Sequence, residues 1–208
     1  MANEMAAFGQ VRSGILRRKR LAWGPGLAAI AFATAAISVV WLHPTGALAI
    51  GGPFHLIDAK SGRQVSDKDF RGKWLLVFFG YTHCPEVCPT TLSNIADAMS
   101  LLGPLAARVQ PLFITLDPER DTSSVLVEYA KAFAASIIAL SGNSEEIAAA
   151  ARAYHVYYAK RGANDDYSVD HTATIYVVRP DGAYATSILS TADGSEIARQ
   201  LRVLWRHT

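Results

Sequence analysis

Cysteine, net charge and internal repetition are all scarce in this sequence. Its 208 residues include two cysteines, which can form one disulfide at most. The formal net charge at pH 7 is +2, which is too small to indicate nucleic acid as a partner. No segment repeats and none is of low complexity, which excludes solenoid and propeller architectures. A chain of this length then predicts one ordinary domain with an additional segment.

The excess positive charge lies in the first twenty residues. Residues 1–20 contain Glu4 and five basic side chains, a balance of +4, whereas the other 188 residues together carry −2. The five basic residues are Arg12, Arg17, Arg18, Lys19 and Arg20. The basic character therefore belongs to an N-terminal tail and not to the folded body.

Charge is absent from the segment that follows this tail. The run from Leu21 to Leu42 contains 22 residues without a charged side chain, close to the roughly 20 residues that cross the hydrocarbon core of a bilayer. The positive cluster before the run favours a cytoplasmic tail and export of everything after it. The sequence thus predicts a cytoplasmic tail at 1–20 and a transmembrane helix at 21–42.

A cleavable signal peptide is the chief alternative to this anchor. Ala47, Leu48 and Ala49 have the small-x-small form of a cleavage site. The apolar core of a signal peptide usually contains about 7–15 residues, so the longer run favours a retained anchor. A buried helix of a soluble protein is a third, weaker interpretation. Because a mitochondrial protein usually has a longer targeting extension, we expect the bacterial inner membrane, with the domain facing the periplasm.

Two parts follow the apolar run: a linker at 43–53, which ends in Gly-Gly-Pro, and a folded domain at 54–208. The apolar pattern of the domain alternates strands with helices, which predicts the α/β class. Helices are expected after the cysteines, after Thr122 as N-cap, after a capping box of Asn143 and Glu146, and at the C-terminus. The predicted strands are 54–58, 64–66, 74–79, 109–116, 137–140, 155–160, 172–178 and 184–189.

The two cysteines, Cys84 and Cys88, lie between the most apolar strand and a helix. Ligands and chemistry collect at the carboxyl ends of central strands in such sheets. Pro85 and Pro89 suit the first turn of a helix, where no backbone N–H is needed. A helix N-terminus favours thiolate over thiol, and thiolate is the form that binds metal or attacks a disulfide. The pair is therefore a candidate for metal binding or for redox chemistry.

Other functions of the cysteine pair fit less well. A structural disulfide between them would close a very short loop and contribute little stability. A thioredoxin-type redox motif has two residues between its cysteines, whereas this one has three, which lets two thiolates spread around a shared ion. A peroxiredoxin would need Thr three residues before its reactive cysteine, where this chain has Tyr81 or Pro85. Metal binding and dithiol exchange both remain open.

Two thiolates leave a metal ion under-coordinated, so a third ligand is expected. Of the six histidines, His171 ends a polar loop and opens a predicted strand. In a thioredoxin topology, the loop before this strand faces the turn that carries the cysteines. His83 adjoins Cys84, but an adjacent side chain often points elsewhere. The remaining four are expected to be solvated or structural: His43, His55, His155 and His207.

Three motifs and the apolar N-terminal segment together carry a family resemblance. The motifs are GYTHCPEVCP at 80–89, LDPERDT at 116–122 and VDHTATIYVVRPDG at 169–182. In this order and spacing they resemble the Sco/SenC family of copper-binding assembly factors for cytochrome c oxidase, over about residues 54–206. One departure is Ser123-Ser124, where the family commonly has a proline after the DT pair.

The resemblance implies a thioredoxin-like fold, in which helices flank a central mixed sheet. It implies Cys84, Cys88 and His171 as copper ligands, and copper delivery to, or thiol reduction of, the binuclear copper site in oxidase subunit II. The expected partners are that subunit, other copper carriers or thiol reductants, and the membrane. The donor set agrees, because two thiolates and an imidazole suit Cu(I) and can hold Cu(II), whereas zinc usually takes a fourth ligand.

The candidate residues allow two main functions. A metallochaperone, which has no classical turnover, needs all three ligands and is the function we favour. A thiol–disulfide oxidoreductase needs only Cys84 and Cys88 as a redox-active pair. A peroxide or copper-stress sensor is a third hypothesis. Asp170 is a candidate to orient the histidine, whereas Asp117 and Arg120 either shape the site or form a capped turn with a surface ion pair.

Overall fold

The structure, a computed structural model, describes residues 50–162 and 166–206. The predicted tail and anchor, linker residues 43–49, and the histidines His43 and His207 lie outside the described residues. Within the described ranges, no helix combines the length and the apolar character that a bilayer crossing requires.

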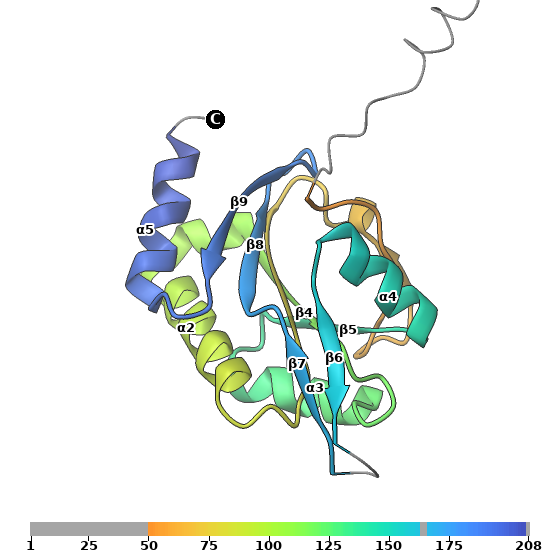
Figure 1. Cartoon of the computed structure of the whole chain (residues 1–208). Helices are drawn as coiled ribbons and strands as arrows, with labels where there is room; N and C mark the ends of the chain where they lie inside the picture. The colour runs from red at the N-terminus through yellow and green to blue at the C-terminus, as the bar shows by residue number, and fades with distance from the viewer. Residues whose placement is uncertain (1–49, 163–165, 207–208) are drawn as a thin grey trace, which may run out of the picture. The chain divides into compact units, whose positions relative to one another are not determined.

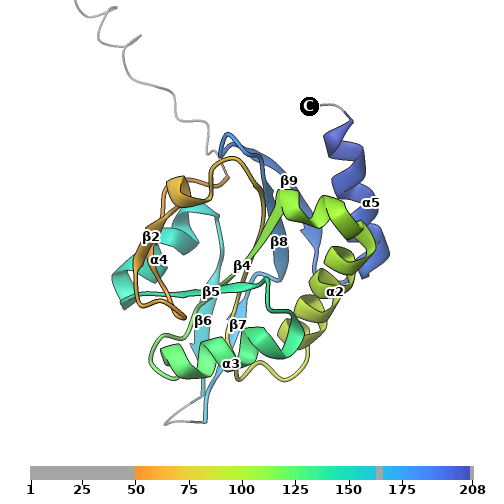
Figure 2. The same ribbon diagram turned by 180° about the vertical axis from the view of Figure 1, so that it is seen from behind.

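Seven strands of the described chain form one mixed sheet in the order β2-β1-β5-β4-β3-β8-β9, which Figures 1 and 2 show from opposite sides. β4 runs parallel to its neighbours β3 and β5, and the other pairs in this sheet are antiparallel. The strands are β1 His55–Asp58, β2 Gln64–Ser66, β3 Trp74–Gly80, β4 Val109–Thr115, β5 Ile138–Ser141, β8 Thr174–Val178 and β9 Tyr184–Leu189.

The helices begin where the local sequence supplies caps. Thr122 accepts a hydrogen bond from the backbone of Val125 at the start of α3, and Asn143 forms the predicted capping box with Glu146 at the start of α4. The α-helices are α2 Val87–Leu102, α3 Ser123–Phe133, α4 Ser144–Ala153 and α5 Gly194–Trp205, and two 3-10 segments are η1 Asp67–Phe70 and η2 Gly103–Arg108.

The central strand β3 is covered on both faces. All seven of its residues are buried, as an unbroken apolar run predicts. Its ring at Phe78 stacks on Phe113, which contacts Tyr129 of α3. The next ring, Phe79, points to the other face and packs on Tyr154 at the end of α4. Figures 1 and 2 show α2 and α5 side by side, at the other side of the sheet from α4.

A second, two-stranded sheet corrects the prediction around His171. β6 (Tyr158–Arg161) pairs antiparallel with β7 (Ser168–His171), so His171 closes one strand and does not open the next. The strand predicted at 155–160 begins later, because His155 adopts the left-handed conformation with φ 55°. Only Val169 is buried in β7, so the strand depends on pairing with β6 and carries almost no apolar pattern of its own.

Candidate metal centre

The cysteines lie at the carboxyl end of β3. Cys88 occupies the first turn of α2 and is fully buried, whereas Cys84 lies in the loop before the helix and is half-buried. The backbone N–H of Cys88 donates to the sulfur of Cys84 at 3.4 Å. Both thiols are free. The helix start therefore holds one sulfur inside the protein and presents the other near the surface.

Gly80 leaves the space that the buried sulfur occupies. A Cβ at this position would lie 2.7 Å from the sulfur of Cys88 and 2.9 Å from the ring of Phe113. Both distances are well inside van der Waals contact, and the ring belongs to the packed core. A residue without a side chain is therefore required at the end of β3 for α2 to approach the sheet this closely.

His171 reaches the sulfurs from the far end of the sequence. Its Nε2 lies 3.5 Å from the sulfur of Cys88, and its Nδ1 lies 3.1 Å from the carbonyl oxygen of Thr172. Since a carbonyl can only accept, the proton of a neutral ring lies on Nδ1, and the lone pair of Nε2 faces the sulfurs. The rings of Phe78 and Tyr81 meet the imidazole edge-on, with centroids 6.3 and 6.0 Å away.

The three side chains form one potential ligand set. The sulfurs of Cys84 and Cys88 and a ring nitrogen of His171 all lie within 4.8 Å of one another. Within residues 50–162 and 166–206, this is the one group of three or more His, Cys, Asp or Glu side chains placed to share an ion. The donor chemistry fits a soft ion such as Cu(I).

The two thiols differ strongly in acidity. A hydrogen bond from the Cys88 thiol lowers the pKa of Cys84 to about 4, against the opposing effect of partial burial and with further help from the backbone N–H groups of Cys88 and Glu86. The same hydrogen bond and burial raise the pKa of Cys88. At neutral pH the pair is therefore one thiolate and one thiol, and a bound ion would have to displace the proton of Cys88.

A buried carboxylate supports the loop that carries Cys84. Asp121, which is 1% exposed, accepts hydrogen bonds from the backbone and hydroxyl of Thr82 and from the hydroxyl of Thr115. His83 is exposed, with Nδ1 at 3.8 Å from the same carboxylate, and does not belong to the ligand group. His55 and His155 also lie outside that group.

The DPERD motif holds the hairpin of β6 and β7, whose last residue is His171. Asp117 is fully buried and accepts from Arg120 Nε and from the hydroxyl of Tyr167, both at 2.6 Å. The guanidinium of Arg120 lies 3.6 Å from the centre of the Tyr167 ring, and Lys160 of β6 forms an ion pair with Glu119. The motif therefore ties the loop after β4 to the hairpin.

Asp170 does not take the orienting role that the sequence suggested. Its carboxylate pairs with Arg161 at 2.8 Å on the exposed side of the hairpin. The Nδ1 of His171 contacts the main-chain oxygen of Thr172 instead. Sequence reasoning also missed Tyr167, because a tyrosine in a polar loop has no local pattern that marks it as a partner of Asp117.

The fold and this site define a thioredoxin-like protein whose Cys-Cys-His group can hold a metal ion. The model of the SCO1/SenC family matches residues 43–206. The chain therefore belongs to the SCO1/SenC family.

Relatives and solved structures agree with this assignment. The human mitochondrial SCO1 homolog is 38% identical over 156 residues, which cover 73% of this chain and 52% of that protein. The structure of Arabidopsis thaliana ScoI with copper bound has a TM-score of 0.73 at 38% identity, covering 77% of this chain and all of that one. The copper-bound structure of Bradyrhizobium japonicum ScoI has a TM-score of 0.69 at 42% identity, covering 74% and 99%.

The alignment with the curated relatives covers only part of their length. The chain spans about half the length of the curated relatives, since the aligned region covers 52%, 55% and 54% of three of them. The residues that the family model matches, 43–206, include both cysteines and His171.

Proposed function

We propose that this protein is a copper metallochaperone that delivers its ion to the binuclear copper site of cytochrome c oxidase subunit II. The observation that carries the proposal is the convergence of two sulfurs and one imidazole within 4.8 Å. Copper-bound structures of two similar Sco proteins support the choice of ion. Copper is the cargo here, held by Cys84, Cys88 and His171.

The unequal burial of the ligands suits a transfer role. Cys84 and His171 are half-buried, whereas Cys88 has no exposed surface. An incoming ligand of a partner can therefore replace Cys84 or His171 first, while Cys88 retains the ion until the exchange is complete. A site with three ligands also leaves room for that incoming ligand, which a closed site with four ligands does not.

An anaerobic Cu(I) competition titration of the full chain tests this function. We expect one Cu(I) per chain, and His171→Ala should weaken affinity by at least about 100-fold, since even the loss of a group behind a ligand costs about 10–100-fold. His55→Ala, at the exposed start of β1, is the matched control and should change nothing. Equal affinity of the wild type and His171→Ala would refute the three-ligand site.

A second function, thiol–disulfide reduction of the partner before metallation, is favoured by the acidity of Cys84. Its thiolate can attack a disulfide of the partner to form a mixed disulfide. Cys88 then loses its proton, attacks the sulfur of Cys84 and releases the partner as a dithiol, which leaves a Cys84–Cys88 disulfide. This exchange does not use His171, so His171→Ala should retain reductase activity while losing tight copper binding.

We also propose that residues 21–42 anchor the protein in the bacterial inner membrane, with the domain in the periplasm. The support is the uncharged run and the basic tail before it. Membranes from cells that make the full chain should retain it through alkaline carbonate extraction. Added protease should reach the domain in spheroplasts. Release of the intact chain by carbonate would contradict the anchor.

A further inference from the structure

Strands β3 and β4 have basic side chains at their amino ends and the metal centre at their carboxyl ends. Lys73 directly precedes β3 and Arg108 directly precedes β4, whereas the cysteine loop and the DPERD motif follow the same two strands. A strand of seven residues extends about 23 Å at about 3.3 Å per residue. The metal centre and these basic side chains therefore lie at opposite edges of the sheet.

The antiparallel strand β8 continues this division. His171 lies before β8 and Arg179 lies after it, at the turn into β9. The backbone N–H of Gly72 donates to the carbonyl of Pro180 at 3.0 Å, which brings residues 71–73 beside this turn. The neighbouring strands β4, β3 and β8 thus each have a basic residue at the edge that lies away from the metal centre.

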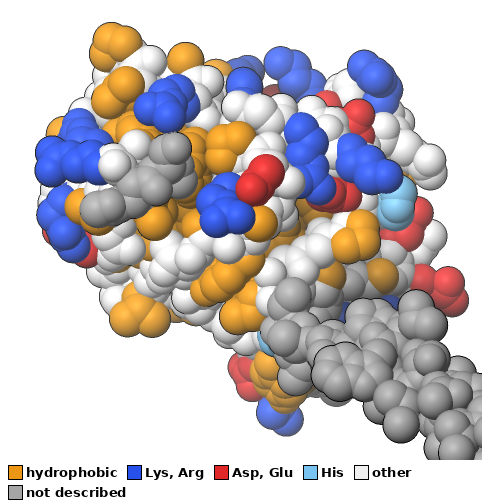
Figure 3. Space-filling view, turned by 90° about the horizontal axis from the view of Figure 1, so that it is seen from above, with side chains coloured by type: hydrophobic (Ala, Val, Ile, Leu, Met, Phe, Trp, Pro, Cys, Tyr) orange, Lys and Arg blue, Asp and Glu red, His pale blue; other side chains and the backbone are white. Residues whose placement is uncertain are grey.

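The end of α5 adds to this basic edge. Arg108 lies 4.7 Å from the ring centre of Trp205, and Arg202 donates to the carbonyl oxygen of Leu101 at the end of α2. Figure 3, which looks onto this end of the molecule, shows Lys and Arg side chains spread over the face. We define the basic edge as Arg71, Lys73, Arg108, Arg179, Arg202 and Arg206.

Few carboxylates balance these charges. Arg71 pairs with Asp67 at 2.7 Å and Arg179 pairs with Asp181 at 3.2 Å. The four other members of the basic edge are exposed, and no carboxylate of the described chain lies within ion-pair distance of them. Because residues 21–208 carry −2 in total, this edge is a local concentration of positive charge on a slightly acidic body.

The described chain begins at this same edge. The backbone N–H of Gly51 donates to Ala153 at 2.8 Å, and a Cβ at Gly51 would lie 3.7 Å from the Cβ of Tyr184, the first residue of β9. The proposed anchor ends at Leu42, eight positions before Ile50. Eight residues span at most about 29 Å, so an anchored domain keeps its basic edge near the bilayer surface.

We propose that the basic edge binds the anionic phospholipid headgroups of the membrane and directs the metal centre away from the bilayer. Attraction between Lys or Arg side chains and an anionic leaflet acts within about one Debye length, about 8 Å at physiological salt. The short linker allows the edge to come within that range. This inference rests on the proposed anchor and is independent of copper binding.

Hydrogen–deuterium exchange of the full chain in nanodiscs tests the proposal. On discs that contain phosphatidylglycerol, we expect slower exchange at 71–74, 108–109, 179–184 and 202–206 than on discs of phosphatidylcholine alone. High salt should remove the difference. Exchange at 82–88, beside the metal centre, should be the same on both lipids.

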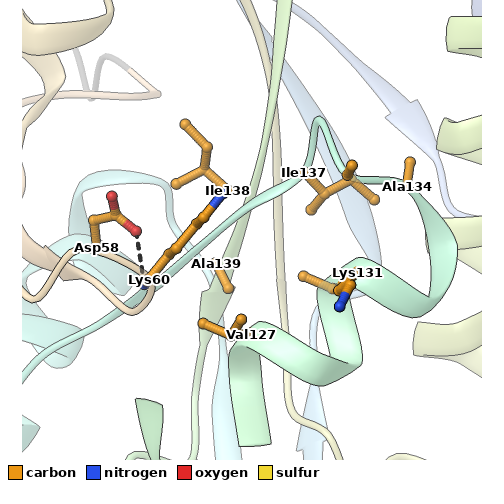
Figure 4. A pocket seen from close by; sticks show the side chains of 10 residues that line it. Asp58, Lys60, Val127, Lys131, Ala134, Ile137, Ile138 and Ala139 are labelled. Atoms are coloured by element: carbon orange, nitrogen blue, oxygen red, sulfur yellow. Dashed lines mark hydrogen bonds between the residues drawn. The ribbon is translucent and has the colours of Figure 1, made fainter. Parts of the chain in front are cut away.

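Charge reversal sharpens the test. Lys73→Glu with Arg206→Glu should abolish the lipid-dependent protection, because each basic residue near an anionic surface contributes about fivefold to binding. The control is Lys60→Glu with Lys131→Glu, which changes the net charge equally. Those two lysines flank an apolar pocket of about 340 Å³ beside β5 and α3 (Figure 4) and are not members of the basic edge. The control pair should leave the protection intact.

The outcomes separate the anchor from the basic edge. A full chain that fails to insert into the discs would refute the anchor. A chain that inserts but shows equal exchange on both lipids, or an equal effect of the two charge reversals, would refute the basic edge as a lipid contact. The proposal would also be overturned if an acidic protein, and not anionic lipid, slowed exchange at the basic edge.

Discussion

The two halves of the metal centre are held in very different ways. The cysteine half belongs to the packed core, since Cys88 is fully buried against Gly80 and Phe113 and the loop of Cys84 rests on the buried Asp121. The histidine half belongs to the two-stranded hairpin of β6 and β7, outside the main sheet. Its neighbours are a few polar and aromatic side chains.

This difference separates two properties of the site. The core determines where the sulfurs lie and which of them is charged, whereas the hairpin determines whether the imidazole is within reach. Mutations in the cysteine half should therefore affect folding and thiol chemistry together. Mutations in the hairpin should affect metal affinity with little change in folding or in thiol chemistry. The predictions below test this division, beginning with the largest effect.

Thiol acidity should depend little on the histidine half. Because the pKa of Cys84 is lowered to about 4, chiefly by the Cys88 thiol, its thiolate is present above that pH and is lost as the pH falls through it. At pH 6 we expect iodoacetamide to modify Cys84 at least about 100-fold faster than Cys88. His171→Ala should keep this selectivity. Mass spectrometry of the modified peptides, with rates measured from pH 3 to 9, checks both statements. A Cys84 rate that rises only near pH 8 would contradict the prediction.

Asp121→Ala should produce the largest loss of stability. The substitution leaves the buried Thr115 and the partly buried Thr82 without their acceptor. An unsatisfied buried polar group costs about 1–3 kcal/mol, so we expect a loss of about 3 kcal/mol in the free energy of unfolding. Urea denaturation measures it. Asp170→Ala, which removes only an exposed ion pair, is the control and should cost less than about 1 kcal/mol.

Gly80→Ala should cost about 1–3 kcal/mol by overpacking. The added Cβ would meet the sulfur of Cys88 at 2.7 Å, so α2 must move away from the sheet. We also expect weaker Cu(I) binding, because the buried sulfur shifts. Gly52→Ala is the control, since its Cβ would meet Ala153 at an ordinary 3.4 Å. Thermal unfolding together with Cu(I) titration distinguishes the two variants, and equal stability of both would contradict the steric argument.

Tyr167→Phe should confine its effect to the histidine half. The change removes the hydroxyl that donates to Asp117, a hydrogen bond to a charged group that contributes about 1.5–3 kcal/mol to holding the hairpin. We expect Cu(I) affinity to fall by about tenfold while the alkylation profile of Cys84 stays unchanged. Tyr184→Phe, at the opposite edge of the sheet, is the control. A shift in the pH profile of Cys84 would show that the two halves are coupled.

Local features were predictable from the sequence because short-range interactions produce them. The strand at 74–79 follows from an unbroken apolar run, and the starts of α3 and α4 follow from Thr122 and from the Asn143–Glu146 capping box. The β7 strand was missed because a stretch with one buried residue resembles a loop until β6 pairs with it.

What the sequence by itself determined is the α/β class, the position of both cysteines at a helix start and the family motifs around them. Only the tertiary structure decided that His171 lies 3.5 Å from Cys88, that one thiol is acidic while the other is not, and that Tyr167 and Asp117 hold the hairpin. The physical reason is that burial and long-range contacts depend on how the sheet brings distant segments together. Two cysteines four residues apart look equivalent until the fold buries one of them.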